Sequence, residues 1–139
     1  ELAERVRRYA GLGESERHKC PLIVVITKYD AWWKLVNMEQ LPTIWKVGEN
    51  GGPGVVDLNM IDKASSLIRT MLLRFSQEFV NAAENFCEEV YYLPVSATGS
   101  APEPDADGNP SHRPKNIHPM WVEVPMLLAL RKYCDGLIK

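Results

Sequence analysis

A continuous run of five apolar residues, 22–26, is the feature that most constrains how this chain can fold. Pro21 precedes the run, and the polar tetrapeptide Thr-Lys-Tyr-Asp follows it directly at residues 27–30. A short apolar run without polar alternation predicts a strand that is buried on both faces, as in the parallel sheets of α/β proteins. The run therefore predicts a second parallel strand and a helix that crosses over between the two.

The second strand is predicted at residues 90–95, an apolar and aromatic run that ends in Ser-Ala-Thr-Gly at residues 96–99. Pro94 has no backbone N–H, which favours a position at the edge of the sheet. Asn59 and Asp62 resemble the cap of a helix that connects the two strands. Apolar residues at steps of three and four predict one continuous amphipathic helix with its aromatic stripe in the core: Ala64, Ile68, Met71, Phe75, Phe79, Ala82 and Phe86.

The remaining elements are less strongly patterned. Leu2, Val6 and Tyr9 have the spacing of a short N-terminal helix, and residues 37–58 are expected to be irregular. A final helix is predicted to begin near Pro125, because proline suits the first turn. Its expected buried face consists of six residues: Met126, Leu127, Leu130, Tyr133, Cys134 and Leu137.

Composition sets limits on the class of protein. The chain has 139 residues, of which 45% are hydrophobic, and this is sufficient for the core of one domain. Its net charge of −2 gives no electrostatic reason to expect binding to nucleic acid or to a membrane. Three cysteines without metal-ligand spacing are expected to be reduced thiols, which favours a cytoplasmic location.

Both predicted strands end in a short polar motif. The first motif is Thr27-Lys28-x-Asp30 and the second is Ser96-Ala97-Thr98. In this order, with a helix between them, they resemble the Thr/Asn-Lys-x-Asp and Ser-Ala-x motifs of the Ras-like GTPase superfamily. The resemblance implies that all six residues bind guanine.

The resemblance also implies a role for individual residues. The Asp30 carboxylate would accept hydrogen bonds from the ring N–H and the exocyclic amine of guanine, a pair of donors that adenine lacks. The stem of Lys28 would lie along the purine face, and the hydroxyl of Thr27 would hold the neighbouring loops. The backbone N–H of Ala97 would meet guanine O6, and Ser96 would order the loop that continues through Thr98.

The sequence has no phosphate loop of the type Gly-x-x-x-x-Gly-Lys-Ser/Thr. The glycine-rich residues 48–54 lack the Lys-Ser/Thr pair, and Pro53 removes an amide donor. The residues Asp-Ala-Asp-Gly at 105–108 match a magnesium motif formally but lie in a proline-rich stretch after the guanine motifs. As a calcium loop the stretch fails at Pro114, where a bidentate Glu is needed. We therefore predict no catalytic residue and no metal site.

These observations predict the C-terminal half of a Ras-like P-loop GTPase domain. The expected fold is a partial three-layer, Rossmann-like α/β arrangement over residues 1–139, with a flexible loop at residues 99–119 that could instead act as a lid or bind a partner. The wide spacing of the two motifs is similar to that of bacterial multidomain GTPase-like proteins. In a completed domain, GTP or GDP and Mg²⁺ would bind.

The expected function is recognition of the guanine base within a GTPase-like switch, without catalysis by this chain alone. The expected partner is the missing N-terminal half or another chain. The free edge of the strand at residues 22–26 could also support self-association, unless a third strand from residues 43–58 covers it. The alternative is a scaffold or protein-interaction domain that is derived from the GTPase fold and does not bind nucleotide.

Overall fold

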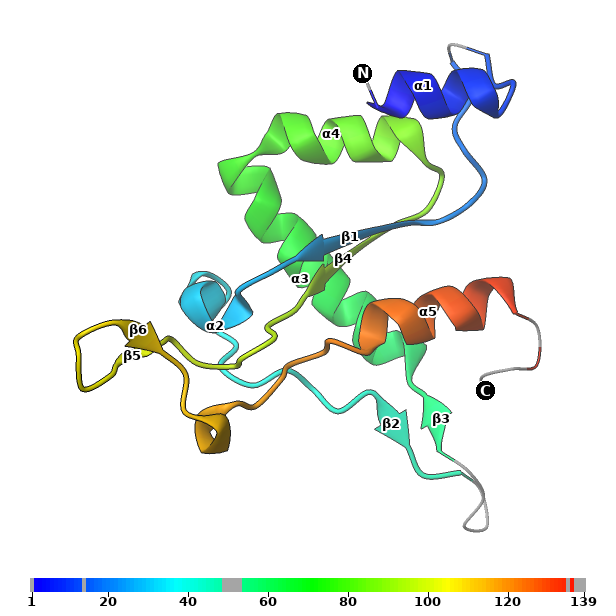
Figure 1. The fold of residues 1–139 in the computed structure, drawn as a ribbon. Helices are drawn as coiled ribbons and strands as arrows, with labels where there is room; N and C mark the ends of the chain where they lie inside the picture. Colours follow the sequence, from blue (N-terminus) through cyan, green and yellow to red (C-terminus); the bar gives the residue numbers. More distant parts are fainter. Residues whose placement is uncertain (1, 14, 49–53, 135, 137–139) are drawn as a thin grey trace.

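The computed structural model shows a mixed α/β chain and describes residues 2–13, 15–48, 54–134 and 136 (Figure 1). None of the helices in these ranges combines the length and apolar character that a membrane crossing requires. The elements, in chain order, are α1 (Leu2–Tyr9), β1 (Leu22–Ile26), α2 (Tyr29–Trp32), the 3-10 turn η1 (Trp33–Leu35), β2 (Trp45–Lys46), β3 (Val55–Val56), α3 (Leu58–Phe75), α4 (Gln77–Phe86), β4 (Val90–Pro94), β5 (Glu103–Pro104), β6 (Pro110–Ser111), the 3-10 turn η3 (Pro114–Asn116) and α5 (Val124–Tyr133).

The strands β1 and β4 form a parallel pair, which confirms the pairing expected from the two apolar runs. The register runs from Leu22 opposite Val90 to Ile26 opposite Pro94. Helices α3 and α4 lie between these strands in sequence, as a parallel connection requires. Both strands therefore end at the same edge of the sheet.

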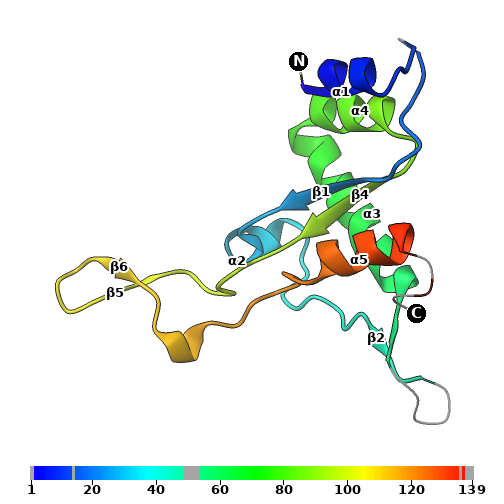
Figure 2. The same cartoon turned by 45° about the vertical axis from the view of Figure 1, so that its right-hand side comes forward.

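Helix α3 covers the outer edge of β4 (Figures 1 and 2). The Val95 N–H donates to Ile26 O across the pair, so alternate residues of β4 direct their backbone groups away from β1. Tyr92 is one of these, and its N–H donates to Ser65 Oγ of α3 at 2.9 Å. Pro94 has the same orientation and lacks an N–H, so it leaves no unsatisfied donor at this edge.

Two groups of side chains form the core. One contains α5, the first turns of α3, and Tyr91 and Leu93 of β4; the other contains α4, the rest of α3, and Tyr92 of β4. Because Tyr91 and Tyr92 are consecutive, their side chains lie on opposite faces of the strand. Both faces of β4 are therefore covered by helices.

The prediction of one continuous helix through residues 64–86 is wrong. Ser76 has φ −154°, outside the helical region, and it separates α3 from α4, which run in different directions in Figure 1. The expected aromatic stripe is also wrong, because Phe75 is 66% exposed and Phe79 is 45% exposed. The apolar spacing continued across the break because Val80 and Ala83 of α4 pack on the same core as Ile68 of α3.

The cap of α3 also differs from the sequence expectation. Asp57 is the N-cap, and its Oδ1 accepts the Asn59 N–H at 3.1 Å. Lys46 of β2 lies 2.9 Å from Asp57 Oδ2. The hydrogen bond from Lys46 lowers the pKa of Asp57, which favours the charged cap at the helix N-terminus.

Helix α5 begins one residue before Pro125, close to the predicted start, but its predicted buried face is correct only in part: Leu127 packs against the core, whereas other members do not. The side chains of Val124 and Leu128 are fully buried, whereas Met126 is 64% exposed. Tyr133 is half exposed, and its hydroxyl donates to Pro21 O. Val124 and Leu128 are four residues apart and therefore lie on the same face of the helix, which packs against the core. The predicted Leu137 lies outside the described residues.

The prediction of a third strand beside β1 is wrong for the residues that the structure describes. The strands β2 and β3 pair with each other in an antiparallel hairpin and do not join β1. The backbone groups of Ile23 and Val25 that point away from β4 have no hydrogen-bond partner in the described ranges. Val25 is 42% exposed and no residue of β1 is fully buried, so the prediction that this strand is buried on both faces is wrong.

The helix break gives a test of the fold. Ile68→Ala should lower the free energy of unfolding by about 3 kcal/mol, because it removes a fully buried side chain. Phe75→Ala should cost less than about 1 kcal/mol, although phenylalanine is larger, because its side chain is mostly exposed. Urea denaturation of both variants measures the difference. Equal losses would mean that Phe75 is packed in the core, against its exposure in this fold.

Candidate functional site

The parallel register of β1 and β4 brings the two sequence motifs together. Ile26 and Pro94 are opposite each other at the ends of the strands, so the chain enters both motifs at the same place. The Tyr29 N–H donates to Val95 O at 3.1 Å and links the turn after β1 to the end of β4. Residues more than 60 positions apart therefore become neighbours at the carboxyl edge of the sheet.

A pocket of about 560 Å³ lies at this edge. A volume of this size suits a small ligand. Several of its lining residues are small or aliphatic, including Val95 and Val122. All six residues that the sequence predicted for the site line the pocket: Thr27, Lys28, Asp30, Ser96, Ala97 and Thr98.

Asp30 lies in the first turn of α2 and is held by Ser96. The Ser96 hydroxyl donates to Asp30 Oδ1 and accepts the N–H of Gly99 at 2.9 Å. Ser96 is only 1% exposed, so these two bonds fix its hydroxyl in one orientation. No other donor in the described part of the chain bonds to the Asp30 carboxylate, and its Oδ2 retains its capacity to accept hydrogen bonds.

Tyr29 anchors the turn between β1 and α2 in the core. Its side chain is fully buried, its ring meets the Trp32 ring edge-on at 4.8 Å, and its hydroxyl donates to Met38 O. Burial raises the pKa of Tyr29 to about 12, so the phenol is neutral at physiological pH. Consecutive helical residues point about 100° apart. Anchoring Tyr29 in the core therefore directs Asp30 towards the pocket.

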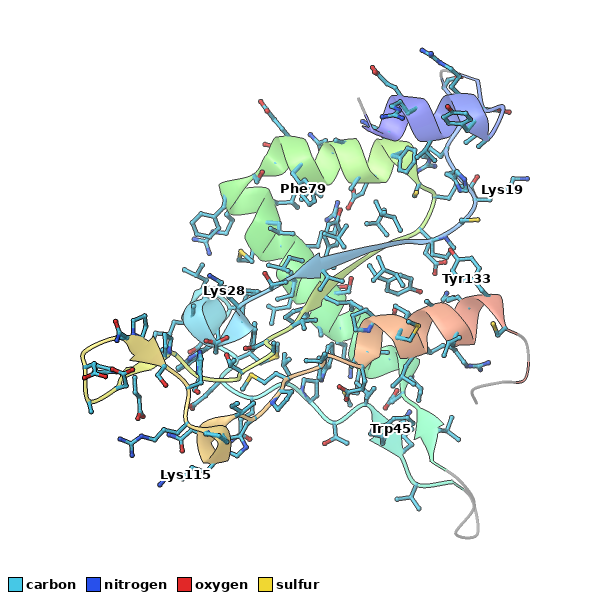
Figure 3. The ribbon with its side chains drawn as sticks, in the orientation of Figure 1. Lys19, Lys28, Trp45, Phe79, Lys115 and Tyr133 are labelled. Atoms are coloured by element: carbon cyan, nitrogen blue, oxygen red, sulfur yellow. The ribbon has the colours of Figure 1, made fainter. Side chains whose placement is uncertain are left out.

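Lys28 forms the bend between β1 and α2. Its backbone is left-handed, with φ 57° and ψ 41°, and its side chain is exposed beside α2 (Figure 3). A left-handed conformation costs a non-glycine residue about 1 kcal/mol, and the surrounding hydrogen bonds offset it. One of these runs from Trp32 Nε1 to Thr27 O at 2.8 Å. The bend allows a helical turn to begin with only two residues between it and the end of the strand.

The second motif contributes backbone donors. In the described residues no acceptor meets the backbone N–H of Ala97 or of Thr98. The Thr98 hydroxyl donates to Ser100 O at 3.1 Å, so the side chain is used within its own loop. Ala97 is exposed and has only a methyl group, which leaves its backbone accessible to a ligand.

Residues 99–119, which the sequence predicted as a flexible loop, are closed at their base by hydrogen bonds between the departing and the returning backbone. We call these two paired segments, 96–98 and 118–120, the stalk. Ser96 and Met120 exchange two backbone hydrogen bonds of 3.0 and 2.8 Å. The His118 N–H donates to Thr98 O at 2.9 Å. Beyond the stalk the antiparallel pair β5–β6 projects away from the sheet (Figures 1 and 2).

This excursion adds residues to the pocket that the sequence did not indicate. Pro102 and His112 line it, as does Val122, which follows the stalk. Loop residues have no periodicity from which their position can be predicted. The one sequence feature that pointed to a place near the pocket is that the loop begins directly after the Ser96 motif. The described residues contain no group of three or more His, Cys, Asp or Glu side chains that could hold a metal ion.

Comparison with protein-family models, with curated proteins and with solved structures gives no match. The resemblance to Ras-like GTPases therefore depends on the residues of the two motifs alone.

The stalk makes a specific prediction about Gly99. Its φ is +70°, and a Cβ at this position would lie 1.9 Å from His118 O. Gly99→Ala should therefore disrupt the stalk and raise the exchange rate of the His118 amide by at least about tenfold, as measured by hydrogen exchange. Gly108→Ala is the matched control, because Gly108 has φ +82° with no atom within 4 Å of the added Cβ. Unchanged protection of His118 in Gly99→Ala would contradict the stalk geometry.

Proposed function

We propose that this chain recognises the guanine base of a nucleotide within a GTPase-like switch. The observation that carries the proposal is that six residues from two separate motifs line one pocket, with Asp30 held in place by Ser96. Neither motif alone is specific, because each could be an ordinary turn after a strand. Their convergence on one pocket supports a shared role.

The chemistry of the pocket suits guanine better than adenine. Asp30 Oδ2, which accepts no hydrogen bond within the described ranges, would together with Oδ1 accept the two donors on the Watson–Crick edge of guanine. The N–H of Ala97, which has no acceptor among the residues that the structure describes, would donate to O6. Adenine would place an amine where Ala97 offers a donor and an unprotonated ring nitrogen where Asp30 offers an acceptor, and both mismatches lower its affinity.

In this proposal the chain is the C-terminal half of a P-loop, Rossmann-like GTPase domain in the cytoplasm. The open edge of β1 is where the phosphate-binding half, on the same or another chain, continues the sheet. That half supplies the phosphate loop and the Mg²⁺ site. A second copy of this chain pairing along the same edge is the competing partner.

The chain alone should not hydrolyse GTP. Phosphoryl transfer depends on a phosphate loop, Mg²⁺ and a group that orients water, and the pocket residues provide none of these. Phosphate release from GTP by the purified chain should equal that of Asp30→Ala. Turnover above that control would show that the chain has catalytic groups of its own.

Nucleoside selectivity tests the proposed function directly. Guanosine should bind with a Kd of about 1 mM, equivalent to about −4 kcal/mol, and GDP within a few fold of it, because only the base is held. Adenosine should bind at least about tenfold more weakly. Asp30→Asn should reverse the preference from guanosine to xanthosine, because the amide can donate to the additional carbonyl of xanthine.

The measurement is titration of the isotopically labelled chain by NMR, with shifts followed at the amides of residues 96–98. Asp62→Asn, an exposed position on α3, is the matched control and should bind as the unaltered chain does. Equal affinity for guanosine and adenosine, or an Asp30→Asn variant that keeps its preference for guanosine, would overturn the proposal.

One observation favours a second candidate, a scaffold domain that no longer binds nucleotide. Asp30 Oδ1 already has a partner in Ser96, so the carboxylate also has a structural role that needs no ligand. In that case no nucleoside causes shifts at residues 96–98, and Asp30→Asn lowers only the stability of the chain.

A further inference from the structure

One wall of the pocket comes from the excursion between the second motif and α5. Ser100, Ala101, Pro102 and His112 line the pocket and belong to this excursion. They come from both arms of the hairpin, because Pro102 precedes β5 and His112 follows β6. The wall is therefore formed by two paired segments of the chain and not by a single extended segment.

The hairpin has internal bonds that hold its shape. At its tip, Asp105 Oδ1 accepts the N–H groups of Asp107 and Asn109, both at 2.9 Å. Near its base, Glu103 on β5 forms an ion pair with Arg113, 3.6 Å away on the returning arm. The tip and the base are thus both tied across the two arms.

The stalk fixes the hairpin relative to the two motifs. The Ser100 hydroxyl donates to Asn116 O at 3.2 Å, next to the His118 N–H bond to Thr98 O. Because Thr98 itself lines the pocket, the stalk and the pocket share a residue. The hairpin and the stalk together therefore place His112 in the pocket wall.

His112 has the only planar ring among the residues that line this pocket. The other lining side chains are aliphatic, small or flexible, and none of them offers a flat surface. A purine has two large faces, and an aromatic ring that stacks on one of them strengthens binding with little dependence on which base is bound. The motif residues Asp30 and Ala97 address the edge of the base, and the expected position of the Lys28 stem accounts for one face, so the other face has no partner among the motif residues.

From this arrangement we propose that the hairpin is a wall of the base pocket and that His112 stacks on the face of the purine. The inference rests on the proposed guanine recognition and adds a determinant of affinity to it. Edge contacts through Asp30 set which base is preferred, whereas a face contact through His112 strengthens binding of any purine. The two residues therefore have separable effects.

The test is the same NMR titration of the whole chain with guanosine and xanthosine. His112→Ala should weaken the binding of both nucleosides roughly tenfold and leave their affinity ratio unchanged, because stacking tolerates either base. His112→Phe should restore affinity to within about threefold. His118→Ala is the matched control, since His118 is exposed on the same segment and does not line the pocket.

The imidazole signals of His112 in the unaltered chain give an independent readout. They should shift upfield on addition of guanosine, as expected for a proton over a purine ring, whereas those of His118 should not. His112→Ala binding as tightly as the unaltered chain, without an upfield shift at His112, would overturn the stacking role and leave guanine recognition intact. Absence of guanosine binding by the unaltered chain would overturn both proposals.

Discussion

The parallel register of β1 and β4 is the constraint on which the rest of the structure depends. Opposing Ile26 with Pro94 places the ends of two strands side by side, and everything that surrounds the pocket follows from that placement. A shift of one residue would turn the side chains of one strand to the other face. It would also separate Ser96 from Asp30, whose hydrogen bond links the two motifs.

A two-stranded sheet is only marginally stable by itself, and here the helices that pack against it stabilise it. Helix α3 covers one edge and satisfies the Tyr92 N–H through Ser65, while core side chains cover both faces. The edge of β1 has no such cover in the described residues. The two edges of one sheet thus differ in character, and the uncovered edge is the side on which an additional strand could be accommodated.

The sequence predicted the features that depend on local patterns. The apolar runs at β1 and β4 identified both strands, and their polar ends identified the residues that line the pocket. It could not predict the break at Ser76, because neither proline nor glycine marks it and the apolar spacing continues across it. It could not place His112 either, because that position depends on hydrogen bonds between residues far apart in the chain.

The paired stalk, which includes the hydrogen bond from His118 to Thr98, also has an evolutionary consequence. It closes the excursion at its base, so the chain returns to the sheet at the same point whatever lies beyond it. Changes in length or composition at the exposed tip, around Gly108, need not alter the register of the strands. The tip can therefore diverge under its own selection, for a different attachment or a different length, while the two motifs beneath it are kept.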